Sequence, residues 1–221
     1  MATLDKEATG LLPRSEDVKK YIEFWNSSPD FYHYRKQEEL IEHLFNPANP
    51  TPNTDPVLVL EKVCVLETFY STNLVRNSGL DALVRMAELI LDYKDFDERL
   101  REGYTSFIEE IVRRWKDRGG RNCLSFATKY CFHHNRQHFH IFDRKVVDAL
   151  LRFKESFGGE CSDTEIIRRM KASYTCYHLW YEFFISHYFE SDYAPDYGKQ
   201  RGRNWCLDKY LWLLGKEIVV E

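Results

Sequence analysis

Asp143 is the acidic residue of this sequence whose setting best suits chemistry. It follows the apolar pair Ile141 and Phe142 and stands where a helix is expected to begin. A carboxylate held at a helix start has a fixed direction and is partly shielded from water, and both features strengthen its effect on a developing positive charge. It can also orient or deprotonate a water molecule. A plain helix cap uses the same residue type at the same place, so both roles stay open.

A basic, glycine-containing break, Arg113 to Arg121, lies one expected helix before Asp143. Gly119 and Gly120 form a turn that leads into the next helix, for which Asn122 is a candidate cap. The N–H groups of such a helix start, together with the cations Arg118 and Arg121, suit a phosphate group. A solvated helix end explains the cations equally well, because cations interact favourably with the C-terminal end of the helix dipole.

The elements that position these residues are all expected to be helices, since glycine and proline are scarce and apolar residues recur with a spacing near 3.6. We expect helices at about 16–25, 31–45, 57–70, 80–91, 97–115, 122–134, 143–153, 162–189 and 205–216. The 46–56 segment, rich in proline and asparagine, is the clearest loop. Ser162 and Glu165 form the sequence pattern of a capping box. The βαβ alternation of a parallel sheet is absent.

Composition limits the class of protein. No run of 18 apolar residues indicates a membrane span, and Met1 to Arg14 lack the apolar segment of a secretory signal, so we expect a cytoplasmic protein. The six cysteines are then expected to be free thiols. The formal net charge of −4 argues against a wide DNA-binding face, so any nucleic-acid contact has to come from local patches.

Several histidines and aromatic residues have both a structural and a functional interpretation. No C-x₂-C pair is present to complete a zinc-binding frame with these histidines, so we expect neither a metal nor a cofactor. The C-terminal aromatic residues are expected in the core rather than in a base-stacking platform. The histidines near Cys123 and Cys131 are His133, His134, His138 and His140, and the aromatic residues include Trp180, Tyr181, Phe183 and Phe184.

The segment Gly119-Gly-Arg-Asn-Cys-Leu-Ser-Phe-Ala-Thr-Lys-Tyr-Cys131, followed by His140-Ile-Phe-Asp-Arg-Lys-Val-Val147, resembles the helix–hairpin–helix DNA glycosylases. In that family a hairpin binds the DNA backbone and is followed by one helix. The sequence Asp-x-x-Val then stands at the start of the next helix. The resemblance covers roughly 57–153 and implies that Asp143 is the catalytic aspartate. Leu66-Glu-Thr-Phe-Tyr-Ser-Thr-Asn73 is similar to the family's helix ending in Leu-Ser-Gln-Gln-Thr. By this likeness Asn73 falls near the residue that enters the duplex, and Tyr70 is a candidate for the base pocket as well as for the core.

The family divides by chemistry at the start of the helix after the hairpin. Members with a lysine there use it as a nucleophile and can also nick the strand, whereas members without it use the aspartate and water. Ser125 stands near this position, 18 residues before Asp143, and by the resemblance a serine there implies a monofunctional enzyme. Lys129 lies one turn further along the same helix, so an amine that could act as a nucleophile is still close by. The sequence departs from the family in lacking the Leu-Pro-Gly-Val-Gly hairpin and four closely spaced C-terminal cysteines for an iron–sulfur cluster.

We therefore expect an all-α fold of two helical lobes around a cleft, in a monomer. One lobe would hold 15–78 and 140–221, and the other 79–139 with a hairpin-like DNA-binding element at 113–125. The substrate would be double-stranded DNA with a damaged or modified base. The protein would release this base from its sugar, either in base-excision repair or in defence against phage DNA with modified bases. The alternative is a non-enzymatic helical module that binds protein or nucleic acid, which the net charge favours. The expected DNA contacts are Asn73, Arg118, Gly119, Gly120, Arg121, Asn122, Ser125 and Lys129.

Overall fold

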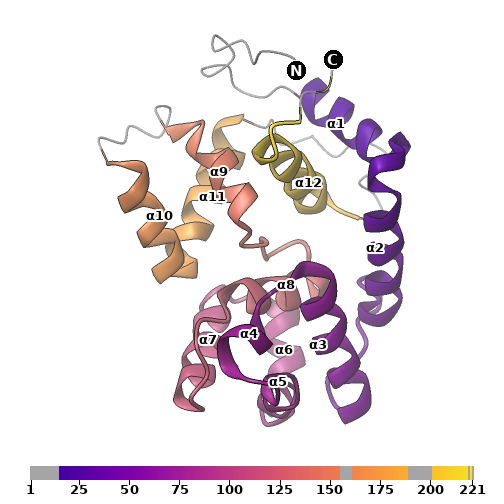
Figure 1. Ribbon diagram of the computed structural model, residues 1–221, viewed down its shortest axis with the longest axis vertical. Helices are drawn as coiled ribbons and strands as arrows, with labels where there is room; N and C mark the ends of the chain where they lie inside the picture. Colours follow the sequence, from indigo (N-terminus) through magenta and orange to yellow (C-terminus); the bar gives the residue numbers. More distant parts are fainter. Residues whose placement is uncertain (1–14, 155–160, 189–200, 219, 221) are drawn as a thin grey trace. The chain divides into compact units, whose positions relative to one another are not determined.

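The computed structural model describes residues 15–154, 161–188, 201–218 and 220, and every regular element among them is a helix (Figure 1). The all-α prediction is confirmed for this part of the chain. None of the described helices has the length and apolar composition needed to cross a membrane. All six cysteines are free thiols, as expected.

The chain divides into two compact units, and each is described by itself. The central unit runs from Ser28 to Phe142, and the terminal unit combines the first 27 residues with Asp143 to Glu221. The sequence predicts residues 28–78 in one lobe with the C-terminal helices. They group instead with residues 79–142, because the helix at 56–70 packs against the helices at 82–91 and 124–134.

The central unit is built around two helices, α3 (Pro56–Tyr70) and α8 (Leu124–His134). α3 contacts α2, α5 and α8, and α8 contacts α6 and α7 as well. Nearly every side chain of α8 is buried, polar ones included. The other elements are a 3-10 helix, η2 (Pro29–Phe31), and the helices α2 (Tyr32–Phe45), α4 (Leu74–Ser78), α5 (Ala82–Leu91), α6 (Phe96–Glu102) and α7 (Ser106–Asp117).

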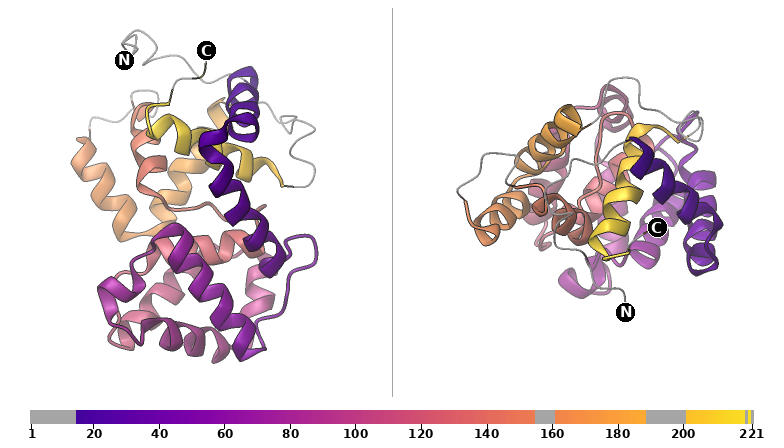
Figure 2. Two further views of the ribbon diagram at one scale, coloured as in Figure 1. Left: turned by 45° about the vertical axis from the view of Figure 1, so that its right-hand side comes forward. Right: turned by 90° about the horizontal axis from the view of Figure 1, so that it is seen from above.

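The terminal unit has α12 (Arg203–Gly215) at its centre, a helix buried on nearly all sides. It packs against α9 (Arg144–Leu151) and α1 (Ser15–Ser27), as the views in Figure 2 show. Aromatic side chains fill the contact with α1, where the rings of Trp25 and Trp212 meet edge to face with centroids 5.7 Å apart. The remaining helices are α10 (Asp163–Ala172) and α11 (Tyr174–Tyr188), which contact each other.

Two of the expected helices are interrupted, and each interruption has a local cause. The helix expected at 97–115 breaks at Gly103, whose φ of +72° ends α6. The side-chain amide of Asn135 caps that end by donating to the carbonyls of Leu100 (2.9 Å) and Arg101 (3.1 Å). The helix expected at 162–189 breaks at Ser173, which is extended (φ −142°) and accepts a hydrogen bond from the N–H of Cys176.

The 46–55 loop is held by a lysine buried in the core of the central unit. The side chain of Lys62 on α3 is 0% exposed, and its Nζ donates to the carbonyl of Thr51 (2.9 Å) and to Oδ1 of Asn53 (3.1 Å). Nε2 of His134 lies 3.4 Å from the same Nζ, and Asp97 accepts the backbone N–H of Asn53 at 2.9 Å. Burial lowers the pKa of Lys62 to about 8, although the charge of Asp97 opposes the shift.

Candidate functional site

The turn between α7 and α8 is a Schellman motif. The N–H of Gly120 donates to the carbonyl of Trp115 (3.0 Å), and the N–H of Gly119 donates to the carbonyl of Lys116 (2.9 Å). Gly119 has a φ of +78°, a conformation that favours glycine, and a Cβ on Gly120 would collide with the Trp115 ring. Both glycines are therefore required by the turn itself, and α7 and α8 pack against each other on its two sides.

Hydrogen bonds within the protein occupy the backbone N–H groups that this turn could otherwise offer to a phosphate. The N–H of Arg121 donates to Oγ of Ser78 at 3.0 Å, so the N–H groups of residues 119–121 are all bonded within the protein. The guanidinium of Arg118 pairs with Asp92, whereas the exposed Arg121 has no ion-pair partner in the described part of the chain. Arg121 thus offers an anion at this turn a charge that no described ion pair neutralises.

Asn122 has the capping role expected of it in a shifted form. The residue before the first helical one is Cys123, yet Oδ1 of Asn122 accepts the N–H of Leu124 at 2.9 Å. This bond satisfies one of the N–H groups left unpaired at the start of α8. Asn122 is exposed, at the end of the turn that leads into Ser125.

One face of α8 carries Ser125, Lys129 and His133, spaced four residues apart. Nζ of Lys129 donates to Oγ of Ser125 (2.7 Å) and to the carbonyl of Phe142 (3.3 Å), and the side chain is only 1% exposed. Tyr70 of α3 completes the cluster: its ring centroid lies 5.3 Å from Nζ, and its hydroxyl lies 2.9 Å from Nε2 of His133. The structure therefore brings three sequence-predicted residues, Tyr70, Ser125 and Lys129, into one polar cluster.

Asn73 lies at a sharply bent turn between α3 and α4. Both Ser71 (φ +48°) and Asn73 (φ +62°) adopt the left-handed conformation, which is uncommon for residues other than glycine. The carboxylate of Glu67 holds the turn by accepting the hydroxyl of Thr72 and the N–H of Leu74 (3.0 Å). The side chain of Asn73 is exposed, and it stands on a turn separate from the Gly119–Gly120 motif.

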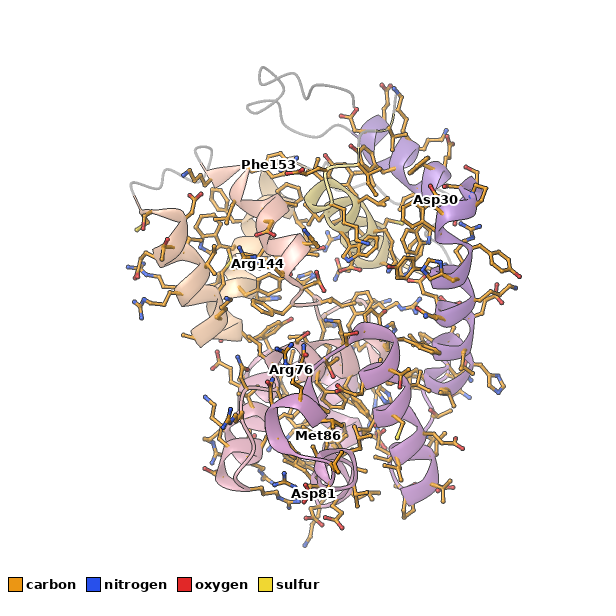
Figure 3. The ribbon with its side chains drawn as sticks, in the orientation of Figure 1. Asp30, Arg76, Asp81, Met86, Arg144 and Phe153 are labelled. Carbon is orange, nitrogen blue, oxygen red and sulfur yellow. The ribbon has the colours of Figure 1, made fainter. Side chains whose placement is uncertain are left out.

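Asp143 is the N-cap of α9, as the sequence predicted. Its Oδ1 accepts the N–H of Lys145 at 2.8 Å, and the residue is half-buried. Figure 3 labels its neighbour Arg144 in the first turn of the same helix. The preceding residue, Phe142, is fixed on α8, because its N–H donates to Oγ1 of Thr128 (3.1 Å) while its carbonyl accepts from Lys129. The peptide group of Phe142 is thus anchored within the central unit, and the terminal unit resumes at Asp143.

Tyr177 of α11 lies in the core of the terminal unit, and no sequence pattern singles it out. It is fully buried, and burial raises its pKa well above the usual value for tyrosine. Negative charge, including that of Asp208 and Asp143, raises the pKa further. The tyrosine therefore remains a neutral hydroxyl.

Residues 17–138, a little over half of the chain, match the family model HI_0787_N, which is described as an N-terminal domain. An uncharacterized protein of Haemophilus influenzae (strain ATCC 51907 / DSM 11121 / KW20 / Rd) is 32% identical to the chain over 163 residues, which cover 72% of this chain and 67% of that protein. The chain belongs to the HI_0787_N family. The family match includes Asn73, Tyr70 and the α7–α8 turn, and it ends before Asp143. No solved structure matches the chain.

Proposed function

We propose that the chain is a divergent helix–hairpin–helix DNA glycosylase that hydrolyses the N-glycosidic bond of a damaged or modified base and leaves an abasic site. The observation that carries the proposal is the setting of Asp143. A carboxylate oriented by the N–H of Lys145 caps α9 directly after Phe142, whose peptide N–H is bonded to α8, and α8 is the second helix of a helix–turn–helix with paired glycines.

The chemistry assigned to Asp143 is electrostatic. The base first has to leave the stack, which costs a few kcal/mol of unstacking. As the bond between base and sugar breaks, the sugar gains positive charge, and a fixed carboxylate lowers the energy of that transition state. Asp143 can then accept a proton from the attacking water.

The contacts of Lys129 support a hydrolytic mechanism without a covalent protein–DNA intermediate. An amine nucleophile has to be unprotonated and open to the sugar carbon. Lys129 is instead buried and donates to Ser125 Oγ and to the carbonyl of Phe142, which fixes the peptide group before Asp143. We assign Lys129 this positioning role, and Ser125 no covalent role.

The partner in this proposal is double-stranded DNA that carries the altered base. Arg121 and Asn73 are exposed on two turns of the central unit and are the residues we assign to the DNA backbone and the duplex interior, respectively. Tyr70 is half-buried, and we assign it to the base pocket. Both base-excision repair and defence against phage DNA with modified bases fit this activity.

A non-enzymatic helical binding module is the second candidate function. The net charge of −4 favours it, as do the ion pairs that neutralise cations near the turn, such as Arg113 with Asp117 and Arg118 with Asp92. A binding module of this kind gives Asp143 a capping role alone.

An activity assay separates the two candidates. Duplexes that each contain one type of modified base are incubated with the protein and then heated with alkali, which cleaves the strand at abasic sites. The glycosylase proposal expects strand cleavage at the modified position after alkali, and little cleavage without it. Intact strands for every base tested, in the presence of measurable DNA or protein binding, would favour the binding module instead.

A further inference from the structure

Gly215, the last residue of α12, lies against the backbone of α9 in the terminal unit. A Cβ built on Gly215 would overlap the carbonyl oxygen of Lys145 and come within 2.6 Å of its carbonyl carbon and 3.1 Å of its Cα. Figure 1 shows α9 and α12 side by side, and they are in extensive contact. The atoms in the way belong to the backbone, so they cannot rotate aside as a long side chain would.

Close packing is the reason for a glycine at this position. Gly215 is not among the glycines with positive φ, so its backbone conformation is open to any residue. It is also the last helical residue of α12, and alanine is a better helix former than glycine. Helix propensity and backbone conformation would both accept alanine, and only the contact with Lys145 excludes it.

The same Lys145 orients the carboxylate of Asp143. The N–H of Lys145 donates to Oδ1 of Asp143 at 2.8 Å, and its carbonyl is the group against which Gly215 packs. The N–H and the carbonyl of Lys145 are joined through the same Cα atom. A displacement of the carbonyl by a side chain at residue 215 would therefore also displace the N–H. The first turn of a helix has no intrahelical partners for its N–H groups, and here packing on one side and a cap on the other hold it in place.

We propose that Gly215 is a positioning residue for Asp143: by leaving no side chain at the end of α12, it lets α12 close on the first turn of α9 and hold the N–H of Lys145 against the Asp143 carboxylate. This inference rests on the proposed function for its catalytic consequence. Its structural part, the restraint of the Lys145 N–H, stands independently of any activity.

The test compares two alanine substitutions at the two ends of α12. Gly215→Ala adds a methyl group against Lys145. Gly202→Ala adds the same group at the N-cap of the helix, where nothing lies within 4 Å and the strain comes from a φ of +81°. Gly202→Ala thus controls for a general loss of stability in α12 without a collision with α9.

The first measurement is amide hydrogen exchange at Lys145 by NMR in the whole 221-residue chain. In the unsubstituted protein we expect this amide to be protected like those within α9, although it belongs to a first turn. Gly215→Ala should speed its exchange at least tenfold, and Gly202→Ala should leave it within about twofold. Fast exchange in the unsubstituted protein overturns the proposal, and this result is obtained even if Gly215→Ala does not fold.

The second measurement is the single-turnover rate of base release together with DNA affinity. A displacement of about 1 Å can cost about a hundredfold in rate, so Gly215→Ala should lower the rate strongly and leave the dissociation constant for DNA within about threefold. An equal loss in both variants, or unchanged rate with Gly215→Ala, overturns the positioning role. Absence of base release from the unsubstituted protein, with the expected exchange at Lys145, would instead refute the glycosylase proposal alone.

Discussion

Replacing Lys62 with methionine should change how the stability of the protein depends on pH. Burial lowers the pKa of Lys62 from its usual 10.5 to about 8 in the folded state. Between these two values the unfolded chain binds more protons at this residue than the folded protein does. Stability therefore rises with pH across this interval, and the contribution of Lys62 is lowest below about pH 8, where the folded protein has to bury the charged ammonium.

The size of the effect follows from the shift. The full difference between 10.5 and about 8 corresponds to roughly 3 kcal/mol, of which about 1 kcal/mol is gained between pH 7 and pH 9. Buried thiols act in the opposite direction in the same interval, because burial raises the pKa of Cys123 to about 12 and only the unfolded chain ionises there. The unsubstituted protein and Lys62→Met share those thiols, so the difference between their free energies of unfolding reports Lys62 alone.

The assay is urea unfolding at a series of pH values, followed by circular dichroism, for the unsubstituted protein and for Lys62→Met. The free energy of unfolding of the unsubstituted protein should gain about 1 kcal/mol relative to the variant between pH 7 and pH 9. Lys36→Met is the control, because a hydrogen bond with Glu39 raises the pKa of Lys36 out of this interval. A difference that stays constant with pH would mean that Lys62 keeps an ordinary pKa in the folded protein.

Three further predictions concern the α7–α8 turn and α8. Arg121→Ala should reduce the slope of log binding constant against log salt concentration by nearly one, the change expected when one phosphate contact is lost. Arg118→Ala removes a cation that is paired with Asp92, so it should reduce this slope less. Equal slopes for the two variants would show that the pairing with Asp92 does not matter. Borohydride should trap no protein–DNA adduct through Lys129, and a trapped adduct lost in Lys129→Met would show covalent chemistry. Gly120→Ala should destabilise the protein by about 1–3 kcal/mol through its collision with Trp115, and urea unfolding with a change below about 0.5 kcal/mol would contradict the described turn.

The helices that could be predicted from the sequence are those whose boundaries depend on neighbouring residues. α3 begins after the proline-rich loop, and α9 begins at Asp143, whose carboxylate accepts the N–H of Lys145 two residues later. Ser162 likewise caps α10 by accepting the N–H of Glu165. Apolar spacing and capping residues are local properties, so the sequence alone is sufficient for them.

The missed features depend on contacts between distant residues. α4 is a single short helix held at its start by Glu67, and nothing within Leu74–Ser78 itself predicts it. By its residue type Lys62 is expected at the surface. Its burial depends on the 46–55 loop, where the carbonyl of Thr51 accepts its hydrogen bond. The interruption at Gly103 could have been predicted, because a glycine within an expected helix is a common C-terminal signal.

The candidate site was predicted in part. The resemblance to the glycosylases singles out Ser125, 18 residues before Asp143, and Lys129 lies one turn further along the same helix. The structure places Tyr70 beside Lys129. The bonds that occupy the N–H groups of residues 119–121 could not be predicted, because one of their acceptors, Ser78, is more than forty residues away in the chain. The contact between Gly215 and Lys145 is non-local in the same way.

The rate of base release by Asp143→Asn tests the central claim most directly. Asparagine caps a helix about as well as aspartate, so the fold should survive while the charge is lost. We expect the single-turnover rate to fall by about a hundredfold or more, with DNA binding retained. Asp148→Asn is the matched control, since Asp148 lies on the same helix and pairs with Arg144 at 2.7 Å. Full activity of Asp143→Asn, or an equal loss in Asp148→Asn, would contradict the assignment of the chemistry to Asp143.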